Sequence, residues 1–170
     1  MSGHWFPVYI GVGSNIEDPR AQVLRAVDTL RAFAPEQFRV IAVSPLYGTK
    51  PFGPIPQPDF VNGAVGALTQ LDPLALLKRL KQIEAAMGRP AQREKWGPRI
   101  IDLDLLLYGR EQLRSPELTL PHPGIVERNF VLYPLADIAP DLDVPGLGRV
   151  AELKRRVAQA GIWPLESASR

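Results

Sequence analysis

The chain has 170 residues, of which 45% are hydrophobic and 22% charged, and its formal net charge at pH 7 is +2. This composition predicts one globular domain over residues 1–170 with a single core, and so small a charge excess gives little support for nucleic-acid binding. The absence of cysteine excludes disulfides, thiolate metal sites and a cysteine nucleophile, and residues 1–9 lack the features of a signal peptide, so we expect a cytoplasmic protein without a membrane-spanning segment.

The first 58 residues predict a strand, a helix, a second strand and a long loop. Val8–Val12 is a short apolar run, and an Asp-Pro pair, typical of a helix start, then begins a helix predicted over residues 19–33. Its apolar positions recur at helical spacing. A second strand is predicted over Phe38–Ser44, followed by a Pro- and Gly-rich loop over Pro45–Pro58.

The order of elements predicts the fold class. A strand over Phe60–Leu68 precedes a helix that starts at a second Asp-Pro pair and stops at Gly88, and Ile100–Tyr108 is predicted to be the next strand. The order βαββαβ is that of a ferredoxin-like α+β fold, an antiparallel sheet with both helices on one face. We expect the other face to be free to carry a site.

Residues beyond 109 are predicted to form a C-terminal extension of this fold. It is expected to contain a short strand near residues 118–121, a helical segment near 125–135 and a last helix near 150–160.

The chain is organised around residues 96–109, W-G-P-R-I-I-D-L-D-L-L-L-Y-G. Strand side chains alternate, so Asp102 and Asp104 are expected on one face, opposite a face formed by Ile101, Leu103, Leu105 and Leu107. Two carboxylates at this spacing repel each other unless a cation lies between them, and Mg²⁺ prefers oxygen ligands. A lone D-x-D is also common at solvated strand edges, so the pair does not decide the function by itself.

Taken together, the motifs of the chain resemble those of the 6-hydroxymethyl-7,8-dihydropterin pyrophosphokinase family. The resemblance covers nearly the whole chain and rests on Gly13-Ser14-Asn15, Tyr47-x-Thr49, Pro58-Asp59-Phe60-Val61-Asn62, Gly88-Arg89, Trp96-Gly97-Pro98-Arg99, Asp102-x-Asp104, Pro121-His122-Pro123 and Arg128-x-Phe130. It implies transfer of the β,γ-diphosphate of ATP to the hydroxymethyl group of the pterin, with release of AMP and with two Mg²⁺ ions.

The resemblance assigns a metal and phosphate side to the site. Asp102 and Asp104 match the metal-binding pair, and Arg89 and Arg99 match the catalytic arginines, which also contact ATP. Guanidinium groups suit phosphate oxygens because their donors are fixed in one plane. The remaining matches to ATP-binding residues are Trp96, His122 and Arg128.

The resemblance also assigns a pterin side. Asn62 matches the residue that reads the amide edge of the pterin, since a carboxamide offers a donor and an acceptor side by side. Phe60 and Phe130 match two rings that sandwich the pterin, and Thr49 and Phe52 line the pocket.

Other features of the sequence carry weaker expectations. The basic loop over residues 89–99 is expected to close over ATP, and Ala91 stands where many members carry a second arginine. Lys50 occupies a position where proline is common. Glu84 is expected near the nucleotide, although a solvated helix face would explain it equally well.

Other function classes fit the sequence less well. Single-stranded RNA binding on a ferredoxin-like sheet needs aromatic residues within a basic motif on the central strands, and that motif is missing. A metal-dependent nuclease lacks a third acid at suitable spacing, a Walker-type kinase lacks its P-loop, and a purely structural module leaves the motifs unexplained. We expect a stand-alone monomer with two small-molecule substrates, ATP and the pterin, and without nucleic-acid or membrane partners.

Overall fold

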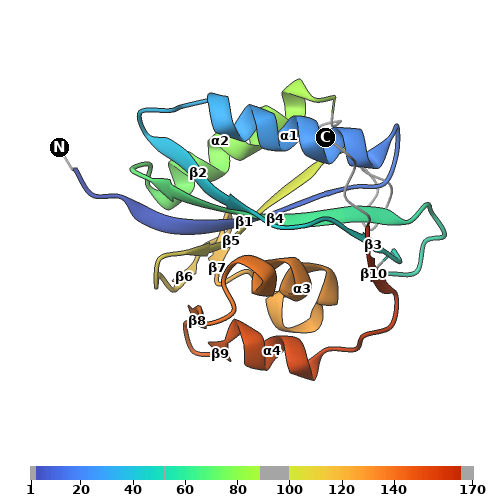
Figure 1. Cartoon of the computed structure of the whole chain (residues 1–170). Coiled ribbons are helices and arrows are strands. Elements are labelled where there is room, and N and C mark those ends of the chain that lie inside the picture. Colours follow the sequence, from blue (N-terminus) through green and yellow to red (C-terminus); the bar gives the residue numbers. More distant parts are fainter. Residues whose placement is uncertain (1–2, 52, 89–99, 166–170) are drawn as a thin grey trace.

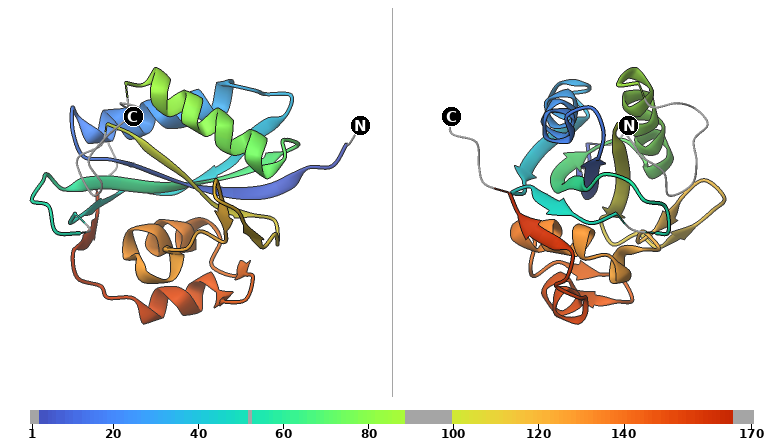
Figure 2. Two further views of the ribbon diagram at one scale, coloured as in Figure 1. Left: turned by 180° about the vertical axis from the view of Figure 1, so that it is seen from behind. Right: turned by 90° about the vertical axis from the view of Figure 1, so that its right-hand side faces the viewer.

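The structure is a computed structural model that describes residues 3–51, 53–88 and 100–165. A six-stranded sheet forms its centre and has helices on both faces (Figures 1 and 2). All of its strand pairs are antiparallel. The strands are β1 (Phe6–Ser14), β2 (Phe38–Val43), β3 (Tyr47–Thr49), β4 (Phe60–Thr69), β5 (Asp102–Tyr108) and β10 (Ile162–Pro164).

Strand order confirms the ferredoxin-like arrangement. The order β2-β4-β1-β5 places the first and third predicted strands side by side at the centre. β2 pairs with the C-terminal half of β4, whereas β3 pairs with its N-terminal end, and β10 pairs with β3. The sequence did not predict β3 or β10 as strands, because three residues in a Pro- and Gly-rich context carry too little alternation to be recognised.

Two helices cover one face of the sheet, as predicted. They are α1 (Pro19–Ala32) and α2 (Pro73–Ala86). Each has an aspartate N-cap before a proline: Asp18 accepts a hydrogen bond from the Ala21 amide at 3.4 Å, and Asp72 accepts one from the Ala75 amide at 2.8 Å. The Asp-Pro pairs therefore mark these two helix starts correctly.

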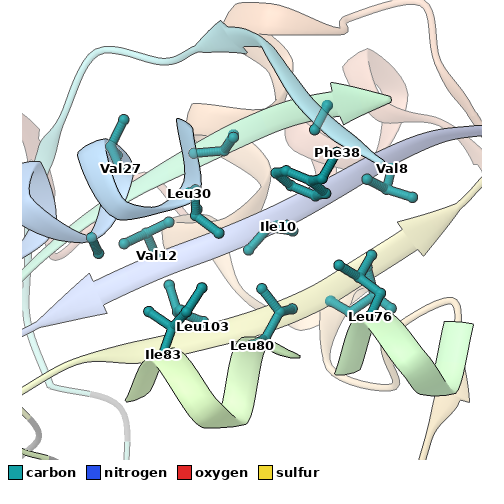
Figure 3. Close-up of a cluster of buried hydrophobic side chains, with 14 of the residues drawn as sticks. Val8, Ile10, Val12, Val27, Leu30, Phe38, Leu76, Leu80, Ile83 and Leu103 are labelled. Atoms are coloured by element: carbon teal, nitrogen blue, oxygen red, sulfur yellow. The ribbon is translucent and has the colours of Figure 1, made fainter. Parts of the chain in front are cut away.

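The core between these helices and the sheet is built from aliphatic side chains. Ile10 of β1 lies between Leu30 of α1 and Leu80 of α2, and all three are fully buried (Figure 3). Leu103 of β5 and Phe38 of β2 complete the same cluster. This cluster follows directly from the alternation of the strands and the 3.6-residue period of the helices.

The prediction that the other face is free was wrong. Two further helices, α3 (Asn129–Ile138) and α4 (Val150–Arg156), lie on that face (Figures 1 and 2) and build a second apolar cluster with it. The helical segment predicted near residues 125–135 is a short 3₁₀ helix, η1 (Ile125–Glu127), followed by α3. Helical periodicity indicates that a helix forms but does not say on which face of a sheet it docks.

A β-bulge in β5 corrects a second expectation. Tyr9 pairs with Leu107 and Ile10 pairs with Leu105, which leaves Leu106 as an extra residue. Leu103 and Leu105 therefore face α1 and α2, while Leu107 joins the second cluster beneath α3. Strict alternation had placed Leu107 with the other two leucines.

Short elements complete the C-terminal extension. The strand expected near residues 118–121 is β7 (Thr119–Leu120), which pairs with β6 (Leu113–Arg114), and a second small hairpin joins β8 (Asp143–Val144) to β9 (Gly148–Arg149). The last helix ends at Arg156, earlier than expected. In the described part of the chain, no helix has both the length and the apolar character needed to cross a membrane.

Candidate active site

One row of paired residues brings the two sides of the predicted site together. Gly13 of β1 pairs with Asn62 of β4 on one side and with Asp102 of β5 on the other. Residues paired across antiparallel strands share a face of the sheet. Neighbouring strands are about 4.8 Å apart, so the Cα atoms of Asn62 and Asp102 are separated by roughly 10 Å. The pterin-side and metal-side residues thus lie on one face, two strands apart.

The two aspartates occupy the same face of β5, as predicted. Asp104 pairs with Gly11 and Asp102 with Gly13, so each carboxylate lies beside a residue that has no side chain. Both aspartates are half-buried. Within residues 3–51, 53–88 and 100–165 no group of three or more metal-ligating side chains occurs. Two carboxylates on one face of a strand fit a hard cation such as Mg²⁺, which commonly takes one or two carboxylates from a protein.

Glu84 holds the strand that carries these aspartates. It is buried on α2, and its Oε2 accepts a hydrogen bond from the Leu103 amide at 2.7 Å, between Asp102 and Asp104. The alternative of a solvated helix face is therefore wrong for Glu84. Its position four residues after Leu80, within the apolar stripe of α2, was the available sequence signal.

Asn62 is held in one orientation by its neighbours. Its Nδ2 donates a hydrogen bond to Thr49 Oγ1 at 2.8 Å, and the two residues are 8% and 1% exposed. A Cβ atom at Gly13 would lie 2.3 Å from Asn62 Oδ1, so the carboxamide lies directly over this glycine. The bond to Thr49 uses one of two amide donors and fixes the plane of the group. Asn62 is thus preorganised to read a flat polar edge.

The two predicted stacking rings come from two opposite walls of the proposed site, which are the sheet strands β3 and β4 on one side and helix α3 on the other. Phe60 lies two residues before Asn62 on β4 and therefore shares its face. Phe130 lies in the first turn of α3, the helix that packs over β4. Asn15 fastens the loop that precedes Phe60, because its Nδ2 donates to Gln57 Oε1 at 2.8 Å and to the Pro58 carbonyl at 2.9 Å.

His122 is held as a neutral hydrogen-bond donor. Burial, together with the nearby positive charge of Arg128, lowers the pKa of His122 to about 4, although the Asp102 carboxylate acts in the opposite direction. The Gly124 amide donates to His122 Nδ1 at 3.1 Å. The single proton of the neutral ring therefore lies on Nε2, which is then a donor.

Arg128 is placed by the residues around it. A Cβ atom at Gly124 would lie 2.6 Å from Arg128 Nε, so the guanidinium occupies the space above this glycine. Its Cζ also lies 5.7 Å from the centroid of the Phe130 ring. Arg128 thus lies near both His122 and Phe130, and His122 is also within the influence of the Asp102 carboxylate.

Four predicted site residues lie outside the described residues. They are Phe52, Arg89, Trp96 and Arg99, and the expected closure of the loop over residues 89–99 lies there too. The sequence placed Tyr47 in a family motif but assigned it no role in the site. Tyr47 pairs with Asn62 on the site face, and its hydroxyl donates to Asp137 Oδ2 of α3 at 2.5 Å. No local pattern signals this contact between distant segments.

The chain is similar in sequence to known proteins. Residues 9–140 match the family described as 7,8-dihydro-6-hydroxymethylpterin-pyrophosphokinase. A 2-amino-4-hydroxy-6-hydroxymethyldihydropteridine pyrophosphokinase of Pseudomonas aeruginosa is 46% identical over 161 residues, which is 95% of this chain and 98% of the relative. The corresponding protein of Methylorubrum extorquens is 44% identical over 158 residues, 93% of this chain and 98% of the relative.

Solved structures show the same fold at low identity. The wild-type Plasmodium falciparum HPPK-DHPS structure with pteroate matches with a TM-score of 0.69 and 16% identity over 92% of this chain. The structure of the same protein with pterin and p-hydroxybenzoate matches with a TM-score of 0.68 and 15% identity. This chain spans 43% and 42% of those longer chains.

Proposed function

This chain belongs to the 7,8-dihydro-6-hydroxymethylpterin pyrophosphokinase family, and we propose that both substrates bind on the sheet face beneath α3. The enzyme transfers a pyrophosphoryl group from ATP to the hydroxymethyl group of the dihydropterin, a step of folate biosynthesis. The observation that supports this placement is the paired row Asn62–Gly13–Asp102, because it puts a carboxamide and a carboxylate roughly 10 Å apart on one face.

The metal and phosphate end of the site is proposed at β5. Asp102 and Asp104 would hold Mg²⁺, two ions being expected from the family. When bound, the metal neutralises phosphate charge and orients it for in-line attack. The buried hydrogen bond from Leu103 to Glu84 fixes the strand between the two carboxylates, which keeps both on the same face.

Two described residues are proposed to contact the phosphates of ATP. His122 presents the proton on Nε2 while remaining neutral, and Arg128 supplies a fixed positive charge beside it. Charge-assisted hydrogen bonds of this kind stabilise the spreading negative charge of phosphoryl transfer. Arg89, Trp96 and Arg99 are proposed to contact ATP from the family resemblance alone.

The pterin end is proposed at β3, β4 and α3. The Asn62 carboxamide, oriented by Thr49, would pair with the amide edge of the pterin. Phe60 and Phe130 would stack on its two faces, and Phe52 is assigned by resemblance. The pterin hydroxymethyl oxygen then attacks the β-phosphorus of ATP and gives up its proton to water, the bond from that phosphorus to the α,β-bridging oxygen breaks, and AMP leaves.

Product analysis tests this reaction. Incubation with ATP, Mg²⁺ and 6-hydroxymethyl-7,8-dihydropterin should give AMP and the pterin diphosphate, and chelation of the Mg²⁺ should stop the reaction. Formation of ADP would indicate an ordinary kinase instead and would contradict the proposal. The monomeric state, the single domain and the cytoplasmic location stay predictions.

A further inference from the structure

We propose that residues 157–165, here called the C-terminal clamp, hold the two walls of the pterin site at their working distance. The clamp follows α4, contains β10 and runs beside β3 (Figure 1). It is fastened at both ends to elements that carry proposed pterin residues. The inference rests on the pterin site proposed above, and it assigns positioning roles to Trp163 and Asn129.

The first fastening is the pairing of β10 with β3. Ile162 pairs with Thr49 and Trp163 with Gly48. The pairing is extended at both ends, because the Lys50 amide donates to the Gly161 carbonyl at 2.8 Å and the Leu165 amide donates to the Leu46 carbonyl at 3.0 Å. Without β10, β3 would be a three-residue edge strand, and so short a strand is weakly held on its own.

Trp163 packs where β3 has no side chain. A Cβ atom at Gly48 would lie 2.2 Å from Trp163 Nε1, so the indole covers this glycine. The Lys50 ammonium lies 6.0 Å from the centroid of the same ring. Gly48 and Thr49 face opposite sides of the sheet. Trp163 therefore supports β3 from the side away from Asn62, and it acts through Thr49 without touching the pterin.

The second fastening is at the start of α3. Asn129 Nδ2 donates to the Ala158 and Ala160 carbonyls, both at 2.9 Å. Asn129 lies between Arg128 and Phe130, so the clamp is bound at the turn that presents the second stacking ring. One short segment thus links the wall that carries Thr49 and Asn62 to the wall that carries Phe130.

The two fastenings have a specific consequence for binding. A pterin stacked between Phe60 and Phe130 needs the walls at one separation, and a preformed gap reduces the ordering cost of binding. The metal-binding aspartates lie on β5, on the other side of β1 and β4 from the clamp. Loosening the clamp at β10 should therefore weaken pterin binding much more than nucleotide binding or chemistry.

Calorimetry on four variants of the full chain tests this separation. Trp163→Ala and Asn129→Ala should each weaken binding of 6-hydroxymethyl-7,8-dihydropterin about tenfold. The affinity of Trp163→Ala for α,β-methylene-ATP with Mg²⁺, and its kcat at saturating pterin, should stay within about twofold of the parent values. Asn129→Ala is compared by its pterin affinity alone, because the neighbouring Arg128 is proposed to contact the phosphates. Trp163→Phe should recover most of the pterin affinity. Trp5→Ala, which removes an indole stacked on Arg39 of β2, is the matched control and should change neither affinity.

Two results of this calorimetry would overturn the proposal. One is an unchanged pterin affinity in both alanine variants. The other is an equal loss for pterin and nucleotide, which would make the clamp a general stabiliser of the fold.

Hydrogen exchange on the unmodified enzyme gives an independent test that no folding defect can obscure. Linkage is reciprocal: if the clamp favours pterin binding, then bound pterin must stabilise the clamp and slow its hydrogen exchange. The Lys50 and Leu165 amides should exchange more slowly with saturating pterin, and less so with α,β-methylene-ATP. Unchanged exchange at both amides would overturn the clamp.

Asn62→Ala distinguishes a wrong clamp proposal from a wrong proposal for the pterin site. Suppose that Asn62→Ala loses pterin affinity, while the Lys50 and Leu165 amides of the unmodified enzyme exchange equally fast with and without pterin. The proposed pterin site is then supported and the clamp is not. If Asn62→Ala binds pterin with the parent affinity, the proposed pterin site is wrong, and the clamp proposal, which rests on that site, is wrong as well.

Discussion

The face of the central sheet beneath α1 and α2 and the site region on its other face are built on different principles. Beneath α1 and α2, the aliphatic side chains Ile10, Leu30 and Leu80 interleave without exposed surface (Figure 3). Beneath α3, the corresponding positions near the end of β1 are glycines, and a buried carboxamide lies over one of them. The first face contributes burial of apolar area. The second brings a carboxamide close over a glycine and orients polar groups, as a binding site requires.

Removing a side chain should therefore affect stability in one of these regions and activity in the other. A deletion beneath α1 and α2 should lower the free energy of unfolding and leave the chemistry of the folded enzyme unchanged. A deletion among the polar residues of the site, such as Asn62 or Asp104, should alter binding or turnover and leave stability nearly unchanged. Four measurements test or sharpen this contrast.

Leu80→Ala should have the largest effect, and on stability alone. It removes a fully buried side chain of α2 and leaves a cavity, which should lower the free energy of unfolding by about 3 kcal/mol. Urea unfolding measures the loss, and kcat of the folded enzyme should match the parent. Leu74→Ala, on the exposed side of the same helix, is the control and should change stability by less than about 0.5 kcal/mol. A matching fall in kcat for Leu80→Ala would remove the distinction between the faces.

Asp104→Asn should have the opposite effect, lowering activity without lowering stability. Loss of one metal-ligating carboxylate should lower kcat/KM at least about 100-fold, roughly 2.7 kcal/mol of barrier. The melting temperature without ligands should stay the same or rise, since repulsion with Asp102 is relieved. Steady-state kinetics and a thermal melt measure the two effects, with the exposed Asp28→Asn as the matched control. Near-native turnover of Asp104→Asn in Mg²⁺ would show the metal assignment to be wrong.

His122 should make stability depend on pH in a defined direction. Its pKa is about 4 in the folded protein against 6.5 for the free side chain. As the pH falls below about 6.5, the unfolded state binds a proton that the folded state does not, so stability is lost until the pH reaches about 4. Between pH 7 and pH 5 this amounts to about 2 kcal/mol. Urea unfolding at both pH values should show this loss in the parent and not in His122→Gln, whereas equal pH slopes would contradict the buried neutral ring.

Asn62→Ala should have the smallest effect and the most selective one. It removes the group that faces the pterin edge, so pterin affinity should fall about tenfold, roughly 1.4 kcal/mol. Affinity for α,β-methylene-ATP with Mg²⁺ should not change. Calorimetry with each ligand measures both quantities, and Thr49→Val, which removes only the acceptor that orients Asn62, should show a smaller loss of the same kind. Equal losses for both ligands would make Asn62 a structural residue.

The sequence by itself determined the parts of this protein that depend on local pattern. The Asp-Pro pairs marked the starts of α1 and α2, and the order of elements predicted the ferredoxin-like sheet. The family motifs predicted the activity that the comparisons confirm. Alternation placed Asp102 and Asp104 on one face, because strand geometry fixes the relation between residues two apart.

Only the tertiary structure decided what depends on contacts between distant segments. The bulge at Leu106 turned Leu107 to the opposite face from Leu105, and α3 covered the face that was expected to be open. The bond from the Leu103 amide to Glu84 and the pairing of β10 with β3 join residues far apart in the chain. Local propensity carries no information on such pairings, because each is selected by the packing of the whole fold and not by the residues beside it.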